Sequence, residues 1–110
     1  PLGIAGFTSG LANVRPDLSL DIWRAASSAD WNGLVERVST ILPFELMRTR
    51  DAGRFNVSVL KRALAWQGWD VGDVRTPCGD LDADTERELR DLLASGPVAA
   101  GGTAGVESTW

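Results

Sequence analysis

Two adjacent hydroxyl side chains, Thr8 and Ser9, are the groups in this chain that are best placed to bind a ligand. They follow a charge-free run of small and apolar residues, 3–7, and they precede Gly10. Such a run is typical of a strand that is buried on both faces, and a ligand can approach where such a strand ends. By residue type alone, a plainer interpretation is favoured: a turn whose hydroxyls bond nearby backbone groups.

The remaining chemistry of the chain is restricted, because it contains no histidine and no tyrosine. Catalysis by a Ser-His-Asp or Cys-His arrangement is therefore excluded, and the commonest zinc ligand is missing. Proton chemistry within the chain must come from carboxylates, Lys61 or Cys78. An amine such as Lys61 can form a Schiff base. Its place beside Leu60 and Leu64 in a helical pattern favours a surface lysine instead.

Composition narrows the class of protein. The chain has 110 residues, 44% of them apolar and 24% charged, which is typical of one globular domain. A net charge of −4 without a basic cluster argues against nucleic acid as a partner. No apolar run reaches the roughly 20 residues that span a bilayer, so we expect no membrane partner. The single cysteine fits a reducing compartment, and the cytoplasm is expected.

Apolar spacing predicts helices at residues 17–27, 31–42, 44–50, 57–67 and 83–94. We expect a kink or a restart at Pro43, and a stop at residues 51–53. Asn56 and Asp82 are predicted to cap the helices that follow them, and Ser28 or Asp30 the helix from residue 31. From residue 96 onward small residues dominate, which predicts a flexible tail over 96–110.

Four segments in this order resemble the dihydrodipicolinate synthase and N-acetylneuraminate lyase family of class I aldolases. Residues 6–16 fit a Gly-x-x-Ser-x-x-x-Asn pattern that is similar to the family's eighth strand and its exit loop. Residues 25–31 resemble its turn between helices, and residues 56–68 resemble its "VK.AL…G" helix. Residues 74–77 resemble its "(V/L)R.P" segment.

The resemblance implies an α/β parent protein, a (β/α)8 TIM barrel with an extra C-terminal helical segment. This chain would be the last strand with its exit loop (1–16), the mostly α-helical C-terminal segment (17–95) and the tail. The family implies a homo-oligomeric lyase or synthase that forms a Schiff base with pyruvate or a related 2-oxo acid. It then makes or cleaves a carbon–carbon, or carbon–oxygen, bond without metal or organic cofactors.

Two statements about the site follow from the resemblance. Thr8 and Ser9 match strand-eight positions that line the 2-oxo acid pocket. The family's catalytic lysine and tyrosine lie upstream, so we expect the isolated chain to be inactive.

One alternative stays open at this point, a self-contained helical interaction module with residues 3–16 as a flexible arm. An exposed coil over these residues favours that module. If they are a barrel strand without its neighbours, we expect them to pair with another copy or to lie against the helices as a loop.

Overall fold

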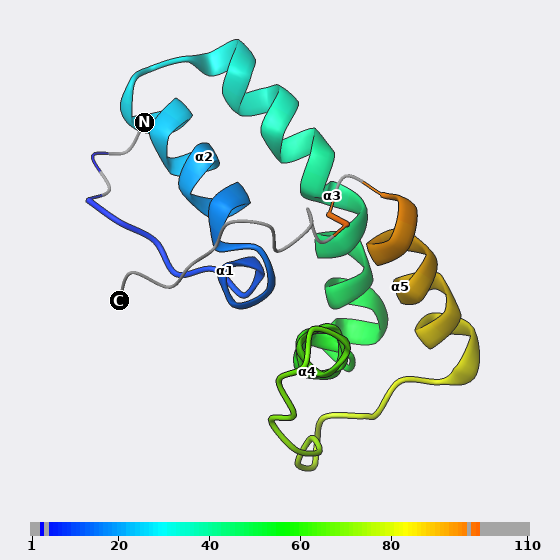
Figure 1. Cartoon of the computed structure of the whole chain (residues 1–110). Helices are drawn as coiled ribbons and strands as arrows, with labels where there is room; N and C mark the ends of the chain where they lie inside the picture. Colours follow the sequence, from blue (N-terminus) through cyan, green and yellow to red (C-terminus); the bar gives the residue numbers. More distant parts are fainter. Residues whose placement is uncertain (1–2, 4, 97, 100–110) are drawn as a thin grey trace.

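The computed structural model describes residues 3, 5–96 and 98–99, and in them all regular structure is helical (Figure 1). The helices are α1 (Leu11–Val14), α2 (Pro16–Ser27), α3 (Trp31–Gly53), α4 (Asn56–Trp66) and α5 (Ala83–Ser95). Helix α3 is the longest, and it contacts α2, α4 and α5. Figure 1 shows α2 on one side of α3 and α5 on the other, with α4 seen end-on below them.

The segment predicted as a strand carries no strand at residues 3 and 5–10. Residues 5–8 are exposed, and α1 begins within the predicted exit loop. The segment lies against α2 as a loop: the rings of Phe7 and Trp23 stack with their centroids 5.8 Å apart. A strand needs a neighbour to pair its N–H and C=O groups, and the described chain offers none. The pairing of this segment in a whole barrel stays a prediction.

The helix ends confirm two of the predicted caps. Asp30 accepts a hydrogen bond from the Gly33 N–H at 3.0 Å, and Asp82 accepts one from the Thr85 N–H at 2.7 Å. The prediction that Asn56 caps α4 is wrong. Asn56 is the first residue of α4, and its side-chain oxygen accepts a hydrogen bond from Arg48.

The kink in α3 lies near its end and not at Pro43. The backbone angles leave the helical range at Arg50, Asp51 and Ala52, which confirms the predicted stop, whereas the helix continues through Pro43. A proline inside a helix costs about 3 kcal/mol. Phe44 and Met47, one and four positions after the proline, are buried in the core, and their packing offsets this cost.

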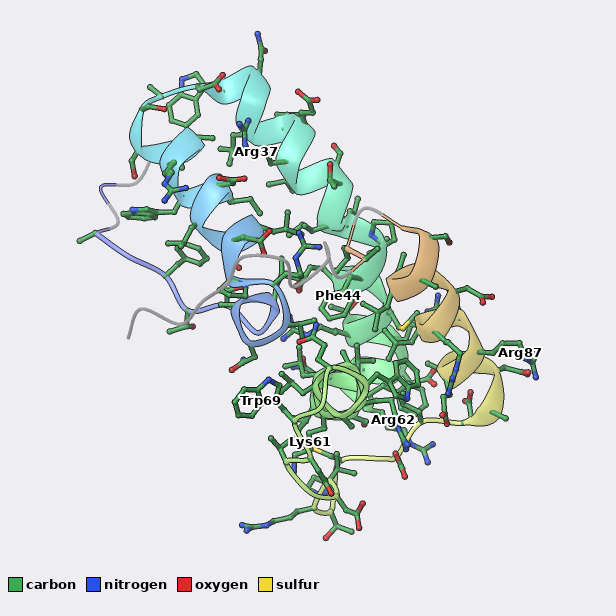
Figure 2. The ribbon with its side chains drawn as sticks, viewed as in Figure 1. Arg37, Phe44, Lys61, Arg62, Trp69 and Arg87 are labelled. Carbon is green, nitrogen blue, oxygen red and sulfur yellow. The ribbon has the colours of Figure 1, made fainter. Side chains whose placement is uncertain are left out.

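One cluster of buried apolar residues forms the core, and it draws on α1, α3, α4, α5, the residue before α4 and the turn after α5: Leu11, Val14, Phe44, Met47, Phe55, Val59, Ala63, Leu89 and Val98. Figure 2 shows Phe44 in the middle of the helices. Part of the apolar surface of α3 lies outside this core. Val38 and Leu42 are 39% and 45% exposed, because the other side of the helix carries Phe44 and Met47.

The predicted flexible tail is wrong at its start. Val98 is completely buried in the core, and the Ala99 N–H donates to the Gly96 carbonyl at 2.8 Å. The chain turns back after α5 because burying this apolar side chain is favourable. Residues 97 and 100–110 lie outside the described residues.

Arg15 connects this turn to the start of α2. Its guanidinium donates to the carbonyl of Ala99 and to both carboxylate oxygens of Asp17, at 2.8 and 2.6 Å. The hydrogen bond from Arg15 holds the pKa of Asp17 below its ordinary value of 3.8. The carboxylate also lies in the first turn of α2, where the helix dipole favours a negative charge.

Replacing Phe44 by alanine should lower the free energy of unfolding by about 3–5 kcal/mol, because it leaves a cavity in the core. Urea unfolding of the 110-residue chain, followed by circular dichroism, measures this loss. Leu46→Ala is the matched control on the same helix, since Leu46 is 55% exposed. Equal losses in the two variants would contradict the placement of the core.

The pair of Arg15 and Asp17 should make stability depend on pH in the acid range. Because the pKa of Asp17 is lowered in the folded state, the pair stabilises the fold above about pH 3.8. This stabilisation is lost as the pH falls further, through the folded-state pKa. Asp17→Asn should therefore be less stable than the unmodified chain at neutral pH, and the difference should shrink in acid. A difference that does not change with pH would refute the ion pair.

Candidate functional site

An open cleft lies between the loop at residues 7–10 and the helices α2 and α3. Its volume is about 300 Å³, and its lining includes both predicted site residues: Phe7, Thr8, Ser9, Gly10, Ser19, Ile22, Val38, Ile41, Glu45 and Arg48. The loop forms one wall of the cleft, and the facing sides of the two helices form the rest.

Helical spacing explains how distant residues reach this cleft. Ser19 and Ile22 are three positions apart on α2, and Ile41, Glu45 and Arg48 are separated by four and three positions on α3. Residues at these separations share one face of a helix. The turn at residues 28–30, where Ala29 has a φ of 57°, then brings α3 back along α2.

The hydroxyl groups of Ser9 and Ser19 lie within hydrogen-bond distance, with 3.2 Å between their Oγ atoms. Ser19 is nearly buried, at 5% exposure, whereas Thr8 is exposed on the loop. This contact joins the loop to α2, and three residues that carry hydroxyl groups, Thr8, Ser9 and Ser19, line the cleft. Sequence reasoning missed Ser19, which carries no motif that marks it.

A partly buried ion pair lies in the same wall. Arg48 donates to both carboxylate oxygens of Glu45 at 2.8 Å, and its Nε donates to the Asn56 side-chain oxygen at 2.9 Å. The Arg48 side chain is only 13% exposed. Sequence reasoning missed both charged residues. Their separation of three positions on a helix is the signal that could have found the pair.

The lining groups can bind a small polar ligand. Hydroxyls donate and accept hydrogen bonds, which suits a ligand that carries hydroxyl or carboxylate oxygens. The lining contains no amine.

Lys61 lies in a separate cleft of about 100 Å³ between α4 and the connection at residues 70–80. Its Nζ donates to the Asp73 carbonyl at 2.6 Å, and Figure 2 shows it on that side of α4.

Among residues 3, 5–96 and 98–99, no group of three or more Cys, Asp or Glu side chains could hold a metal ion. No helix in this part of the chain has the length and apolar character that crossing a membrane requires.

Comparison with known proteins finds relatives that are named as dehydratases or lyases. A probable 5-dehydro-4-deoxyglucarate dehydratase from Streptomyces griseus is 34% identical, over 94% of this chain and 34% of the relative. A protein of the same name from Xanthomonas campestris is 29% identical over 84% of this chain and 30% of its own. An uncharacterized DapA-like lyase from Halobacterium salinarum is 33% identical over the same shares. No family model matches the chain.

The fold has a solved counterpart. The crystal structure of dihydrodipicolinate synthase from Bacillus clausii superposes with a TM-score of 0.78, at 30% identity. The superposition covers 84% of this chain and 31% of that protein. The chain thus spans about a third of the length of the curated relatives and of the solved structure it matches.

Proposed function

Because this chain belongs to the dihydrodipicolinate synthase family, as a part of such a protein, we propose that it contributes one wall of the 2-oxo acid pocket in a longer Schiff-base lyase. One observation carries the proposal. Relatives named as dehydratases or lyases align with 84–94% of the chain, and a synthase of known structure shares its helical arrangement.

The names of the relatives favour elimination of water as the reaction. A 5-dehydro glucarate has its carbonyl next to a terminal carboxylate, so the compound in these names is a 2-oxo acid. An amine of the longer protein would condense with this carbonyl and release water, giving an imine. The imine makes the protons of the adjacent carbon acidic, and loss of one of them expels hydroxide from the next carbon. That is the carbon–oxygen form of the lyase chemistry.

Thr8 and Ser9 have a binding role in this proposal. Active sites of (β/α)8 barrels gather at the C-terminal ends of the strands, which is where the resemblance puts these two residues. Both line the cleft in this structure, and Ser9 is joined to Ser19. Their hydroxyls would hold carboxylate or carbonyl oxygens of the 2-oxo acid while the longer protein supplies the amine.

The proposal has three further parts. The isolated chain is inactive, because its sole lysine, Lys61, lies outside the cleft and is bonded to a backbone carbonyl. The longer protein is a homo-oligomer, as the family implies. It works in the cytoplasm and binds no nucleic acid, in keeping with the single cysteine and the net charge of −4.

The alternative is a helical interaction module without catalysis. Residues 5–8 are exposed, as a flexible arm would be, but Leu11 and Val14 of the same predicted arm are buried in the core. The same exposure also follows when a barrel strand lacks its partners. A chemical test of the longer protein separates the two functions.

Borohydride should trap a 2-oxo acid on the longer protein that contains this chain. With pyruvate present, hydride reduces the imine to a stable secondary amine, and mass spectrometry should show one adduct for each chain. The 110-residue chain under the same conditions should show none.

Two results would contradict this proposal. Absence of an adduct on the longer protein would remove the lyase assignment and leave the interaction module. An adduct on the 110-residue chain that disappears in Lys61→Arg would refute its inactivity and make Lys61 the nucleophile.

Removing the hydroxyls of the cleft should weaken substrate binding in the longer protein. Thr8→Val and Ser9→Ala should each raise KM for the 2-oxo acid up to about tenfold, the effect of one lost hydrogen bond. Steady-state kinetics measures this change. Ser95→Ala is the matched control, since the Ser95 hydroxyl donates within α5 to the Asp91 carbonyl at 2.8 Å, and Ser95 is not in the lining of the cleft. Unchanged KM values in both cleft variants would exclude the binding role.

A further inference from the structure

We propose that Arg48 is a positioning residue, which holds the turn at Ser9 and Gly10 in place at the edge of the cleft. The consequence for substrate binding rests on the proposed function, whereas the contact itself does not. Nothing in the sequence motifs marks Arg48 for this role. Three sets of contacts in the structure assign it.

The guanidinium of Arg48 is fixed on two sides. Glu45 accepts two hydrogen bonds at 2.8 Å, and Asn56 accepts one from Nε at 2.9 Å. Both bonds to Glu45 come from one terminal nitrogen, Nη1, whereas Nε donates to Asn56, so two edges of the planar guanidinium are held and its orientation is set. Because Asn56 begins α4, Arg48 also joins α3 to α4.

The third side of the guanidinium lies against Gly10. A Cβ atom at this position would lie 2.2 Å from a terminal nitrogen of Arg48 and 2.5 Å from its Cζ. The backbone does not require glycine, because Gly10 has ordinary helical angles, φ −64° and ψ −36°. The space that a side chain would need is taken by Arg48. The end of an arginine is flexible when free, but here Glu45 and Asn56 hold it.

The turn under Arg48 positions the site hydroxyl and starts α1. The Ser9 carbonyl accepts from the Ala12 N–H at 3.3 Å, and the Gly10 carbonyl accepts from the Asn13 N–H at 3.1 Å. The Ser9 hydroxyl faces Ser19 from this turn. Loss of Arg48 would therefore free the segment that carries Thr8 and Ser9.

Arg48 is less suited to bind the substrate itself. Nη1 donates to both oxygens of Glu45 and the other terminal nitrogen lies against Gly10, so a carboxylate ligand would have to compete with Glu45 or displace the turn. The pair has no net charge, so it offers little attraction for an anion. Positioning of the turn is the role that these contacts support.

A double-mutant cycle on the 110-residue chain tests the contact. Amide hydrogen exchange at Ala12 and Asn13 reports on the turn, and exchange at Leu89 in the core reports on global stability. Gly10→Ala and Arg48→Ala should each raise exchange at Ala12 and Asn13 about tenfold or more, without the same change at Leu89. The double variant should exchange no faster than Arg48→Ala alone, because the new methyl group then meets no guanidinium.

Three outcomes would refute a positioning role of the contact. The first is that the two substitutions have additive effects on exchange, and the second is that exchange at Ala12 and Asn13 does not change in Arg48→Ala. The third is that exchange at Leu89 rises by the same factor, which would mean a general role in stability. Arg87→Ala is the matched control, because Arg87 is 70% exposed and pairs with Asp84 on the surface of α5. It should leave exchange in the turn unchanged. Arg48→Lys should behave like Arg48→Ala, since an ammonium lacks the planar fork.

A second measurement tests the consequence in the longer protein. Arg48→Lys should raise KM for the 2-oxo acid about tenfold while kcat changes little, because the positioned hydroxyls act in binding. The borohydride adduct separates two kinds of failure. No adduct on the unmodified longer protein would refute the proposed function and leave the exchange results standing. An adduct together with an unchanged KM in Arg48→Lys would refute the positioning role.

Discussion

Burial of Phe44 and Met47, two side chains of α3, in the core is the constraint on which the rest of the structure depends. Both side chains are 0–1% exposed, and the core around them takes residues from α1, α4, α5 and the turn at Val98. Burial of two such side chains contributes about 3–6 kcal/mol, which is comparable to the net stability of a small domain. The continuation of α3 through Pro43, and the return of the chain after α5, both serve this core.

The cleft owes its shape to the same helix. Ile41, Glu45 and Arg48 lie along one side of α3, and Phe44 and Met47 hold that side toward α2 and the N-terminal loop. A polar contact between Ser19 and the Ser9 hydroxyl then joins the loop to α2, and the Arg48 guanidinium packs against Gly10. An apolar core thereby orients a polar site, in which the charges of Arg48 and Glu45 form an ion pair. The loop itself contributes little apolar burial, apart from the contact between Phe7 and Trp23.

Similarity to a barrel enzyme coexists here with a structure that has no strand in its described residues. A helix satisfies its backbone hydrogen bonds within itself, so the helical part keeps its arrangement at a TM-score of 0.78. A parallel strand is satisfied only by neighbours that are distant in sequence. The segment before α1 therefore forms an exposed loop here, although its resemblance to the family predicts a strand.

The sequence by itself predicted the family, the helices α2, α4 and α5 to within a few residues, the cap at Asp82, and Ser28 or Asp30 as the cap of α3. These features depend on short-range patterns, which a single chain displays directly. Only the tertiary structure decided that Asn56 bonds Arg48 instead of capping α4, and that Val98 belongs to the core. It also decided that Ser19 and Arg48 accompany Ser9 in one cleft. Such contacts join residues that are far apart in sequence, and the packing of α3 against its neighbours selects among the many pairs that the composition allows.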